Sequence, residues 1–231
     1  MAHYVIIVAG GSGSRMENDT PKQLLPLQGK PLLMHTLQAF HHSRRKPKII
    51  LVLKEGTRHT WEALCHEYDF KIPHHIITGG NTRFHSVKKG LQAIFNKESE
   101  LKNTWIAIHD AVRPLVSDLL IEKLFALAEE KQSAIPFIRS SDTLRIKYSD
   151  GAYKTIPRED VILIQTPQIF HATTLQVAFK QEYQERFTDD ATVVENSGYP
   201  LHFTSGDIRN IKITYPNDLN LAEYWLTRRE D

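Results

Sequence analysis

Short apolar runs alternate with amphipathic stretches along the first 140 residues. The apolar runs predict strands, at residues 4–8, 48–53, 74–78, 105–109 and 133–139. The amphipathic stretches predict helices, at residues 32–42, 57–68, 86–95 and 117–131. Strand and helix in alternation predict an α/β fold: a doubly wound, mostly parallel Rossmann-like sheet, with helices on both faces and right-handed crossovers.

The alternation stops after residue 139. Polar and apolar residues alternate over 143–148 and 153–156, on either side of Asp150-Gly151, and this pattern predicts a hairpin. A polar hairpin has little core to join, so we expect a projecting β-arm at about residues 140–162 that contacts another subunit; a solvated surface hairpin is the alternative. The later pattern predicts helices at 173–187 and 217–228, a further helix that residues 188–192 cap and that ends at about 195, and short strands at 201–203 and 210–213.

Composition narrows the class of protein. The chain has 231 residues, 41% of them hydrophobic, which suits one domain over residues 1–231. Its 29 Lys and Arg against 27 Asp and Glu give a net charge of +2, so no global field attracts nucleic acid or membrane. Cys65 is the single cysteine, the first residues lead directly into a strand, and no apolar run approaches ~18 residues. We expect a cytoplasmic protein.

A glycine-rich loop follows the first predicted strand. Gly10, Gly11 and Gly13 accept positive φ and leave backbone N–H groups open, and Arg15 and Lys22 add positive charge nearby. Open backbone donors beside two cations at the carboxyl end of a strand suit a polyphosphate. The alternative is a glycine-rich turn without a ligand, which Arg15 and the Pro-Lys-Gln unit around Lys22 make less favourable.

Spacing argues against several better-known sites. No P-loop string occurs, and a dinucleotide fingerprint needs a third Gly at position 16, which is Met. A Rossmann-type oxidoreductase stays an alternative only through the partial match of Lys54-Glu55 to the acidic position after the second strand. The chain contains neither H-E-x-x-H nor G-x-S-x-G, which argues against a zinc peptidase and a serine hydrolase.

Asp110 ends the strand at 105–109, where a carboxylate faces the sheet edge. It is a candidate Mg²⁺ ligand, since Mg²⁺ is usually held by one or two carboxylates and substrate phosphates. It is equally a candidate acceptor of a substrate hydroxyl, and a structural ion pair with Arg113 is the alternative. Asp189 and Asp190 fit a helix N-terminus better than a set of ligands.

Cations at loop junctions complete a phosphate-binding set: Arg15, Lys22, Arg113, Arg158 and Lys212. Each alone is more typical of a solvated surface charge, and only their positions at loop junctions single them out. Nucleotidyl transfer requires cations that position two anions and stabilise charge on a pentacoordinate phosphorus. No general base is needed when the attacking atom is a phosphate oxygen.

Six motifs now stand in order along the chain. They are AGGSGSRM at 9–16 with PKQ at 21–23, GGNTR at 79–83 with Ser86, HDAVRP at 109–114, QTPQ at 165–168, TDDA at 188–191 and NIKIT at 210–214. Together they resemble the 2-C-methyl-D-erythritol 4-phosphate cytidylyltransferase family over residues 4–225. The resemblance implies transfer of CMP from CTP to 2-C-methyl-D-erythritol 4-phosphate with Mg²⁺, giving 4-diphosphocytidyl-2-C-methyl-D-erythritol and pyrophosphate in the non-mevalonate isoprenoid pathway.

The resemblance also implies roles for single residues. The implied nucleotide-binding residues are Ala9, Gly10, Gly11, Gly13, Gly80, Asn81 and Ser86. The implied polyol-phosphate-binding residues are Asp110, Arg113, Thr143 and Thr188, and the implied catalytic residues are Arg15, Lys22, Arg158 and Lys212. Thr143 and Arg158 belong to the arm and would reach the neighbouring subunit's site, which implies a homodimer.

Two positions depart from the family pattern. Many members have Asp where this chain has Asn81, and Ala where it has Gly10, and we expect the same reaction because Asn81 still hydrogen-bonds and Gly10 keeps its backbone. The ribitol-5-phosphate cytidylyltransferases share three of the motifs, but TDDA at 188–191 resembles the methylerythritol enzymes better. A non-catalytic CTP sensor and a sugar nucleotidyltransferase that uses UTP or GTP are further alternatives.

Overall fold

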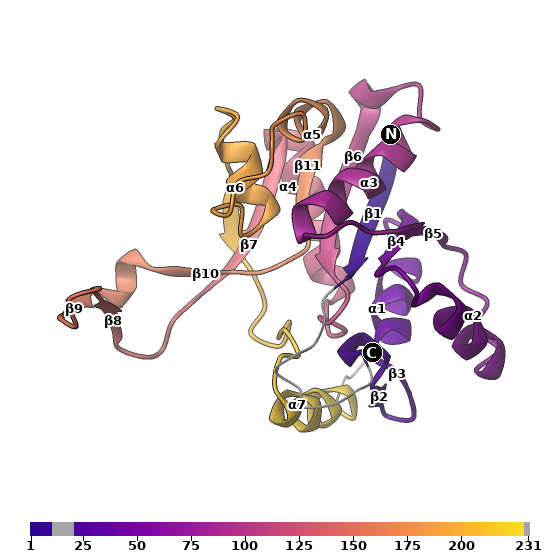
Figure 1. Ribbon diagram of the computed structural model, residues 1–231, viewed down its shortest axis with the longest axis horizontal. Helices are drawn as coiled ribbons and strands as arrows, with labels where there is room; N and C mark the ends of the chain where they lie inside the picture. The colour runs from indigo at the N-terminus through magenta and orange to yellow at the C-terminus, as the bar shows by residue number, and fades with distance from the viewer. Residues whose placement is uncertain (11–20, 229–231) are drawn as a thin grey trace.

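A mostly parallel sheet forms the centre of the computed structural model, which describes residues 1–10 and 21–228 (Figure 1). Within those residues the sheet has eight strands in the order β10-β7-β11-β6-β1-β4-β5, with β12 paired to β7. The strands are β1 (Ala2–Ala9), β4 (Lys48–Leu53), β5 (His75–Thr78), β6 (Thr104–Asp110), β7 (Ser133–Arg139), β10 (Ile162–Ile164), β11 (Gln168–His171) and β12 (Phe203–Ser205). Because β6, β1, β4 and β5 run parallel, their carboxyl ends meet at one edge.

Helices cover both faces of this sheet, as the sequence predicts. The helices are α1 (Leu32–His41), α2 (Arg58–Glu67), α3 (Arg83–Phe95), α4 (Asp118–Lys131), α5 (Ala172–Ala178) and α6 (Asp190–Glu195). α1, α2 and α4 pack on the face that buries Val5 and Ile7, whereas α3, α5 and α6 pack on the face that buries Ile6. Successive strand residues point to opposite faces, so β1 contributes to both cores. In the described part of the chain, no helix has the length and apolar character needed to cross a membrane.

A third, smaller apolar cluster lies at the carboxyl edge. It joins α7 (Pro216–Leu226) to the antiparallel pair β2 (Pro26–Leu27) and β3 (Lys30–Pro31) and to the turn after β6. The Ile213 N–H donates to the Val112 carbonyl at 2.9 Å, which fixes the segment before α7 against that turn. Three short 3₁₀ turns, Lys22–Leu24, Leu101–Asn103 and Arg158–Asp160, complete the described elements.

Strand β11 is absent from the sequence-based prediction. It inserts antiparallel between β6 and β7, pairing Ile169 with Ala107 on one side and with Ala134 on the other. All four of its residues are buried, but only Ile169 and Phe170 are apolar and β-forming, so the local pattern is too short to predict a strand. Its position makes the sheet mixed rather than wholly parallel.

Two predictions at the C-terminal side are wrong, namely the end of one helix and the presence of one strand. The helix predicted to reach residue 187 ends at Ala178, because Gln181 Nε2 donates to the carbonyls of Ala178 at 2.8 Å and Val193 at 3.0 Å and so turns the chain toward α6. The strand predicted at 210–213 does not form, because the Asn210 carbonyl accepts a hydrogen bond from the Arg113 side chain instead of a neighbouring strand. The strand predicted at 201–203 forms later, as β12.

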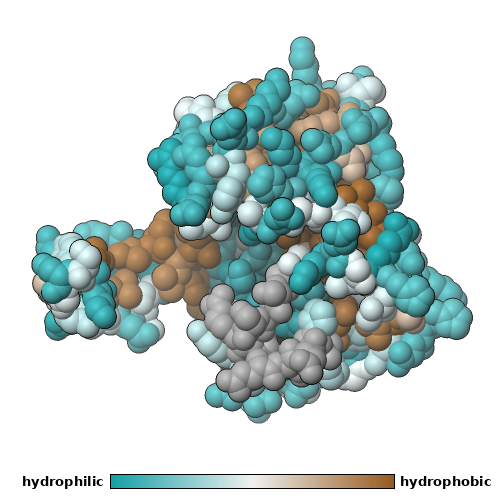
Figure 2. All heavy atoms as spheres, viewed as in Figure 1, coloured by the Kyte–Doolittle hydropathy of each residue, from teal (hydrophilic) through white to brown (hydrophobic). Residues whose placement is uncertain are grey.

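The predicted hairpin is confirmed. β8 (Leu144–Lys147) and β9 (Tyr153–Ile156) pair antiparallel around a turn in which the Ala152 N–H donates to Asp150 Oδ1 and Gly151 has φ +88°. Figure 1 shows this β-arm projecting from the end of β7, well away from the rest of the chain. Figure 2 shows apolar surface along the part that joins it to the domain. The arm exposes 43% of Ile146 and 60% of Tyr153.

Candidate active site

A cavity of about 430 Å³ opens at the carboxyl ends of β1, β4, β5 and β6. It is lined by eight residues that the sequence singles out: Ala9, Gly10, Lys22, Gly80, Asn81, Ser86, Asp110 and Lys212. Parallel strands carry their loops to one edge, which is why residues so far apart in the sequence meet here. Of the described lining residues, four are cations (Lys22, Lys54, Arg83 and Lys212) and one, Asp110, is an acid. This balance suits a polyanion.

The loop after β5 is bound tightly to the first turn of α3. Ser86 Oγ accepts a hydrogen bond from the Gly80 N–H at 3.1 Å and donates to the Thr82 carbonyl at 2.9 Å. A Cβ on Gly80 would lie 2.5 Å from His85 Cβ, a distance that real side chains do not reach. Glycine is therefore required at position 80, and the backbone at 79–82 holds a fixed shape at the wall of the cavity.

The Pro-Lys-Gln unit owes its position to the buried Gln23. Gln23 Nε2 donates to the Ala9 carbonyl at 2.9 Å, and the residue is 2% exposed. This bond ties the 3₁₀ turn at Lys22–Leu24 to the end of β1 and places Lys22 on the cavity wall. The predicted residues Gly11, Gly13 and Arg15 lie outside the described residues.

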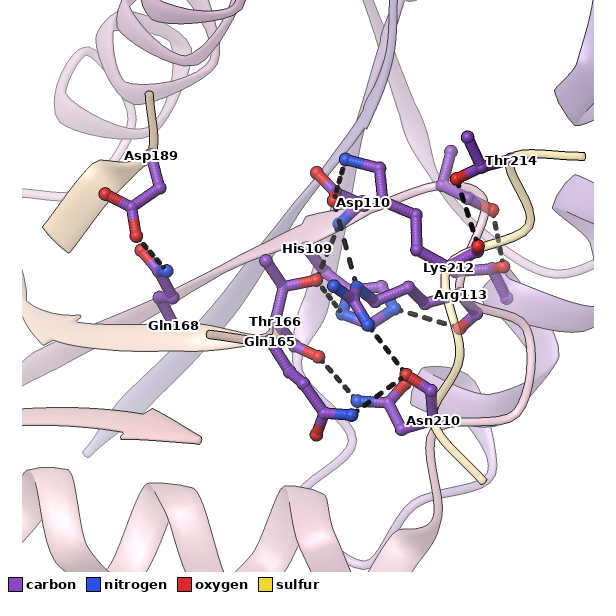
Figure 3. Close-up of polar contacts among 12 residues, drawn as sticks. His109, Asp110, Arg113, Gln165, Thr166, Gln168, Asp189, Asn210, Lys212 and Thr214 are labelled. Atoms are coloured by element: carbon purple, nitrogen blue, oxygen red, sulfur yellow. Dashed lines mark hydrogen bonds and ion pairs between the residues drawn. The ribbon is translucent and has the colours of Figure 1, made fainter. Parts of the chain in front are cut away.

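Three cations surround Asp110. Its Oδ2 lies 2.9 Å from Lys212 Nζ and 3.8 Å from Arg113 Nε, and its Oδ1 lies 3.4 Å from Arg83 Nε. Figure 3 shows both Lys212 and Arg113 directed toward this carboxylate. Burial by itself raises the pKa of Asp110, but the three positive charges outweigh it and hold that pKa well below its usual range. Asp110 is therefore ionised, and its contact with Arg113 is the longest of the three.

A buried hydrogen-bonded group supports Asp110 from behind. The Asp110 N–H donates to Thr166 Oγ1 at 3.1 Å, and the Thr166 hydroxyl lies 3.1 Å from His109 Nδ1. His109 Nε2 lies 3.1 Å from the Arg113 carbonyl, to which it donates. Burial lowers the pKa of His109 to about 3, so the ring is neutral, with its proton on Nε2 and its Nδ1 accepting from Thr166. These bonds fix the turn between β6 and Arg113.

Asn210 attaches the segment that carries Lys212. Its Nδ2 donates to the Thr166 carbonyl at 2.8 Å, and its own carbonyl accepts from Arg113 Nη1 at 2.7 Å (Figure 3). Gln165 Nε2 adds a bond to the Asp207 carbonyl at 2.9 Å. The buried Asn210 thus bonds through its side-chain N–H to one segment and through its backbone carbonyl to another, and these bonds fix a loop that has no secondary structure of its own. Lys212 thereby reaches Asp110.

Four predicted residues do not line the cavity. Arg113 is buried behind Asp110, where it bonds to Asn210. Thr188 is exposed just before α6. Thr143 and Arg158 belong to the β-arm, where Arg158 Nη1 donates to the Ser141 carbonyl at 3.0 Å.

Sequence reasoning missed two cavity-wall cations, Lys54 and Arg83, and the buried partners Thr166 and Asp190. Arg83 Nη2 lies 2.7 Å from Asp190 Oδ2, whose side chain is 1% exposed. Arg83 and Thr166 belong to the GGNTR and QTPQ motifs, and membership in these motifs was the one sign in the sequence that they contribute to the site. Nothing in the local pattern shows that Arg83 would meet Asp190, because the two belong to different helices.

The side chains at the cavity suit Mg²⁺ that is bound mainly by the phosphates of a substrate. The described residues contain no group of three or more His, Cys, Asp or Glu side chains arranged to hold a metal ion. Asp110 is the one carboxylate of the described lining, and it already contacts Lys212 and Arg83. Mg²⁺ usually keeps several waters and binds through substrate phosphates with one or two carboxylates, which this lining can supply.

A cation-lined cavity at the strand ends of a Rossmann-like sheet suits an α/β enzyme of the nucleotidyltransferase class, which is the class of the matching family. The family model for 2-C-methyl-D-erythritol 4-phosphate cytidylyltransferase matches residues 3–228. The chain belongs to this family.

Relatives agree along nearly the whole chain. The 2-C-methyl-D-erythritol 4-phosphate cytidylyltransferase of Bacteroides fragilis is 46% identical over 222 residues, covering 96% of this chain and 98% of that protein. The enzyme of the same name from Bacteroides thetaiotaomicron is 44% identical over 222 residues, with the same coverage. The crystal structure of the Francisella tularensis enzyme of that name is 30% identical with a TM-score of 0.80, covering 97% of this chain and 99% of that one. That of the Thermus thermophilus enzyme is 29% identical with a TM-score of 0.77, covering 98% and 100%.

Proposed function

We propose that this protein transfers CMP from CTP to 2-C-methyl-D-erythritol 4-phosphate, giving 4-diphosphocytidyl-2-C-methyl-D-erythritol and pyrophosphate. The observation that carries the proposal is the convergence of Lys22, Arg83 and Lys212 with Asp110 on one cavity at the strand ends, in a chain of this family. Both substrates are highly charged phosphates, and the cavity supplies the cations to hold them together. We propose that the enzyme works in the cytoplasm, with the nucleotide pool.

The reaction needs alignment and charge stabilisation. A phosphate oxygen of the polyol phosphate attacks the α-phosphorus of CTP, a new P–O bond forms, and the bond to the pyrophosphate oxygen breaks with its electron pair leaving on pyrophosphate. No proton has to be removed from the attacking oxygen. Lys22, together with Arg15, stabilises the negative charge that builds on the equatorial oxygens of the α-phosphorus. Such electrostatic stabilisation is the largest contribution to catalysis of phosphoryl and nucleotidyl transfer. The cytidine lies against Gly80, Asn81 and Ser86, whose backbone is already fixed.

The acceptor lies on the other side of the cavity. Lys212 supplies a positive charge for the polyol phosphate, and ionised Asp110 accepts a hydrogen bond from a polyol hydroxyl. Arg113 holds the segment of Lys212 from behind through its bond to the Asn210 carbonyl, and we propose that Thr188, just before α6, contributes to binding of the polyol phosphate. In this proposal Ala9, Gly10, Gly11 and Gly13 bind the triphosphate; Ala9 and Gly10 line the cavity, and the other two lie outside the described residues.

Mg²⁺ belongs to this proposal as the partner of CTP. It would be held by the triphosphate oxygens with Asp110 as the protein ligand, and it would screen the charge of the leaving pyrophosphate. Chelation by EDTA should abolish pyrophosphate release, and added Mg²⁺ should restore it.

We also propose a homodimer formed through the β-arm. The arm, which carries Thr143 and Arg158, projects away from the rest of its own chain (Figure 1), and it exposes apolar residues, among them Ile146, Tyr148 and Tyr153. A second subunit would cover the apolar surface and receive Thr143 and Arg158 at its own acceptor site.

The deciding experiment is pyrophosphate release with CTP and Mg²⁺, offering 2-C-methyl-D-erythritol 4-phosphate and ribitol 5-phosphate in parallel. Release with the first acceptor alone supports the proposal. Release with ribitol 5-phosphate alone overturns the acceptor while leaving the chemistry in place. No release with either acceptor, from folded protein, overturns both.

A further inference from the structure

Arg83 joins two carboxylates that come from distant parts of the chain. It is the first residue of α3, its Nη2 lies 2.7 Å from Asp190 Oδ2, and its Nε lies 3.4 Å from Asp110 Oδ1. Asp190 is in the first turn of α6, and Asp110 is the last residue of β6. One guanidinium therefore connects α3, α6 and β6 at the wall of the cavity.

The contacts continue as a chain of alternating charge: Asp190, Arg83, Asp110 and Lys212. Burial alone lowers the pKa of Arg83, but Asp190 and Asp110 outweigh it and raise that pKa, so the guanidinium is always charged. A planar fork with several N–H donors can hold two carboxylates at a fixed angle, which a single ammonium cannot.

The chain of charges connects the two substrate sides of the cavity. Arg83 follows directly on the loop of Gly80, to which the proposed function assigns the nucleotide, whereas the proposed function assigns the acceptor to Asp110 and Lys212; all four residues line the cavity. Asp190 ties the first turn of α6, which follows Thr188 and the N-cap residue Asp189, to Arg83. A change in the position of Arg83 would move these groups relative to the loop.

We propose that Arg83 is a positioning residue for the transfer reaction: its guanidinium holds Asp110 and the start of α6 in place and so sets where the polyol phosphate lies relative to CTP. This inference rests on the proposed function. Arg83 acts through Asp110 and Asp190, and the hydrogen bonds among Gly80, Thr82 and Ser86 that shape the loop do not involve its side chain. Its loss should therefore affect the acceptor more than the nucleotide.

The test compares Arg83→Gln with wild type by steady-state kinetics. We expect the KM for the polyol phosphate to rise about tenfold or more and kcat to fall on the order of 10²-fold, because displacement by about 1 Å has that effect on transfer. The KM for CTP should stay within about threefold. Arg83→Lys keeps the charge but not the fork and should give intermediate values; wild-type kinetics in Arg83→Lys would overturn the role of the fork.

A matched control is Arg45→Gln. Arg45 also bridges two carboxylates, Glu122 and Glu129, each at 2.7 Å, and its side chain is 19% exposed, but it does not line the cavity. Its loss should lower thermal stability without changing either KM. If Arg83→Gln behaves as Arg45→Gln does, the proposal is wrong.

The double variant Arg83→Gln/Asp190→Asn separates positioning from folding. Arg83→Gln alone leaves the buried Asp190 charge unpaired and destabilises the fold, whereas the double variant removes that charge as well. We expect the double variant to regain thermal stability and to keep the raised KM for the polyol phosphate. Wild-type kinetics in the double variant would mean that Arg83 only neutralises Asp190, which overturns the proposal. Lack of turnover in the wild type would instead refute the proposed function.

Discussion

Lys212 Nζ lies 2.9 Å from Asp110 Oδ2, although the two residues belong to different halves of the chain. The side chain of Lys212 is 44% exposed, whereas that of Asp110 is 12% exposed, so the ammonium faces the cavity and the carboxylate lies behind it. Asn210 and Thr166 hold the two backbones together, which makes the pair a property of the fold. The pair combines an anion-binding charge with a hydroxyl acceptor in one place.

Lys212→Ala should lower kcat/KM for the polyol phosphate by on the order of 10²-fold, because it removes a preorganised charge at the acceptor side. Asp110 keeps Arg83 and Arg113 as partners, so the fold should be retained. Lys131→Ala, at the end of α4 and remote from the cavity, is the control. If Lys212→Ala and Lys131→Ala had the same kinetics, the assignment of Lys212 to the acceptor site would be wrong.

Lys22→Ala should lower kcat by on the order of 10²–10³-fold, the scale for loss of one preorganised donor at a transition state. Arg15→Ala should have an effect of the same size. Single-turnover measurements with saturating CTP and polyol phosphate test this prediction, since they separate chemistry from product release. Intact turnover in Lys22→Ala would show that this loop does not serve the transferring phosphate.

Gly80→Ala should raise the Kd for CTP by on the order of tenfold, because the new methyl group would meet His85 Cβ at 2.5 Å and force the loop to shift. Titration calorimetry with CTP measures the effect directly. Gly10→Ala is the comparison, since its Cβ would lie 3.6 Å from Ser86 Oγ, an ordinary contact, and should weaken CTP binding much less. If Gly10→Ala weakened CTP binding more than Gly80→Ala does, the proposed arrangement of the loops at Gly10 and Gly80 around CTP would be wrong.

Arg158→Ala and Lys212→Ala should complement each other when mixed and allowed to exchange subunits. Random exchange of equal amounts of the two variants makes half of the dimers mixed. If the arm acts in the partner's site, each mixed dimer has one intact site and one site that lacks both side chains. Activity should then return to about a quarter of the wild-type value. Mixtures as inactive as the separate variants would show that Arg158 serves its own subunit.

His109→Gln should make the free energy of unfolding fall less steeply than in wild type as the pH is lowered from 6.5 to about 4.5. Burial lowers the pKa of His109 to about 3, below the ordinary value near 6.5, so the unfolded chain binds a proton in this range that the folded chain does not. Its stabilising contribution is complete above pH 6.5 and is lost as the pH falls toward 3, by up to about 1.4 kcal/mol per pH unit.

Denaturant unfolding of both proteins at several pH values measures this slope. Burial also lowers the pKa of His74 and His75, but both residues are present in wild type and variant, so their contribution cancels in the difference. Identical slopes in the two proteins would mean that His109 titrates normally in the fold.

The sequence determined the location of the site. Buried strands that end in glycine or in Asp110 form a parallel sheet, and the carboxyl ends of parallel strands meet at one edge. Lys22, Gly80 and Ser86 follow such strands closely, so local pattern was enough to bring them to the cavity. The hairpin was equally predictable, because Asp150-Gly151 between alternating runs is a local signal.

The tertiary structure alone decided which side chains meet. Arg83 pairs with Asp190, and Asn210 bonds to Thr166, only because β11 inserts between β6 and β7 and directs the following chain to α6. β11 is too short for a periodic pattern, and the segment at 210–213 uses side-chain partners in place of a strand. Contacts between distant segments depend on how those segments pack, and no pattern of neighbouring residues contains that information.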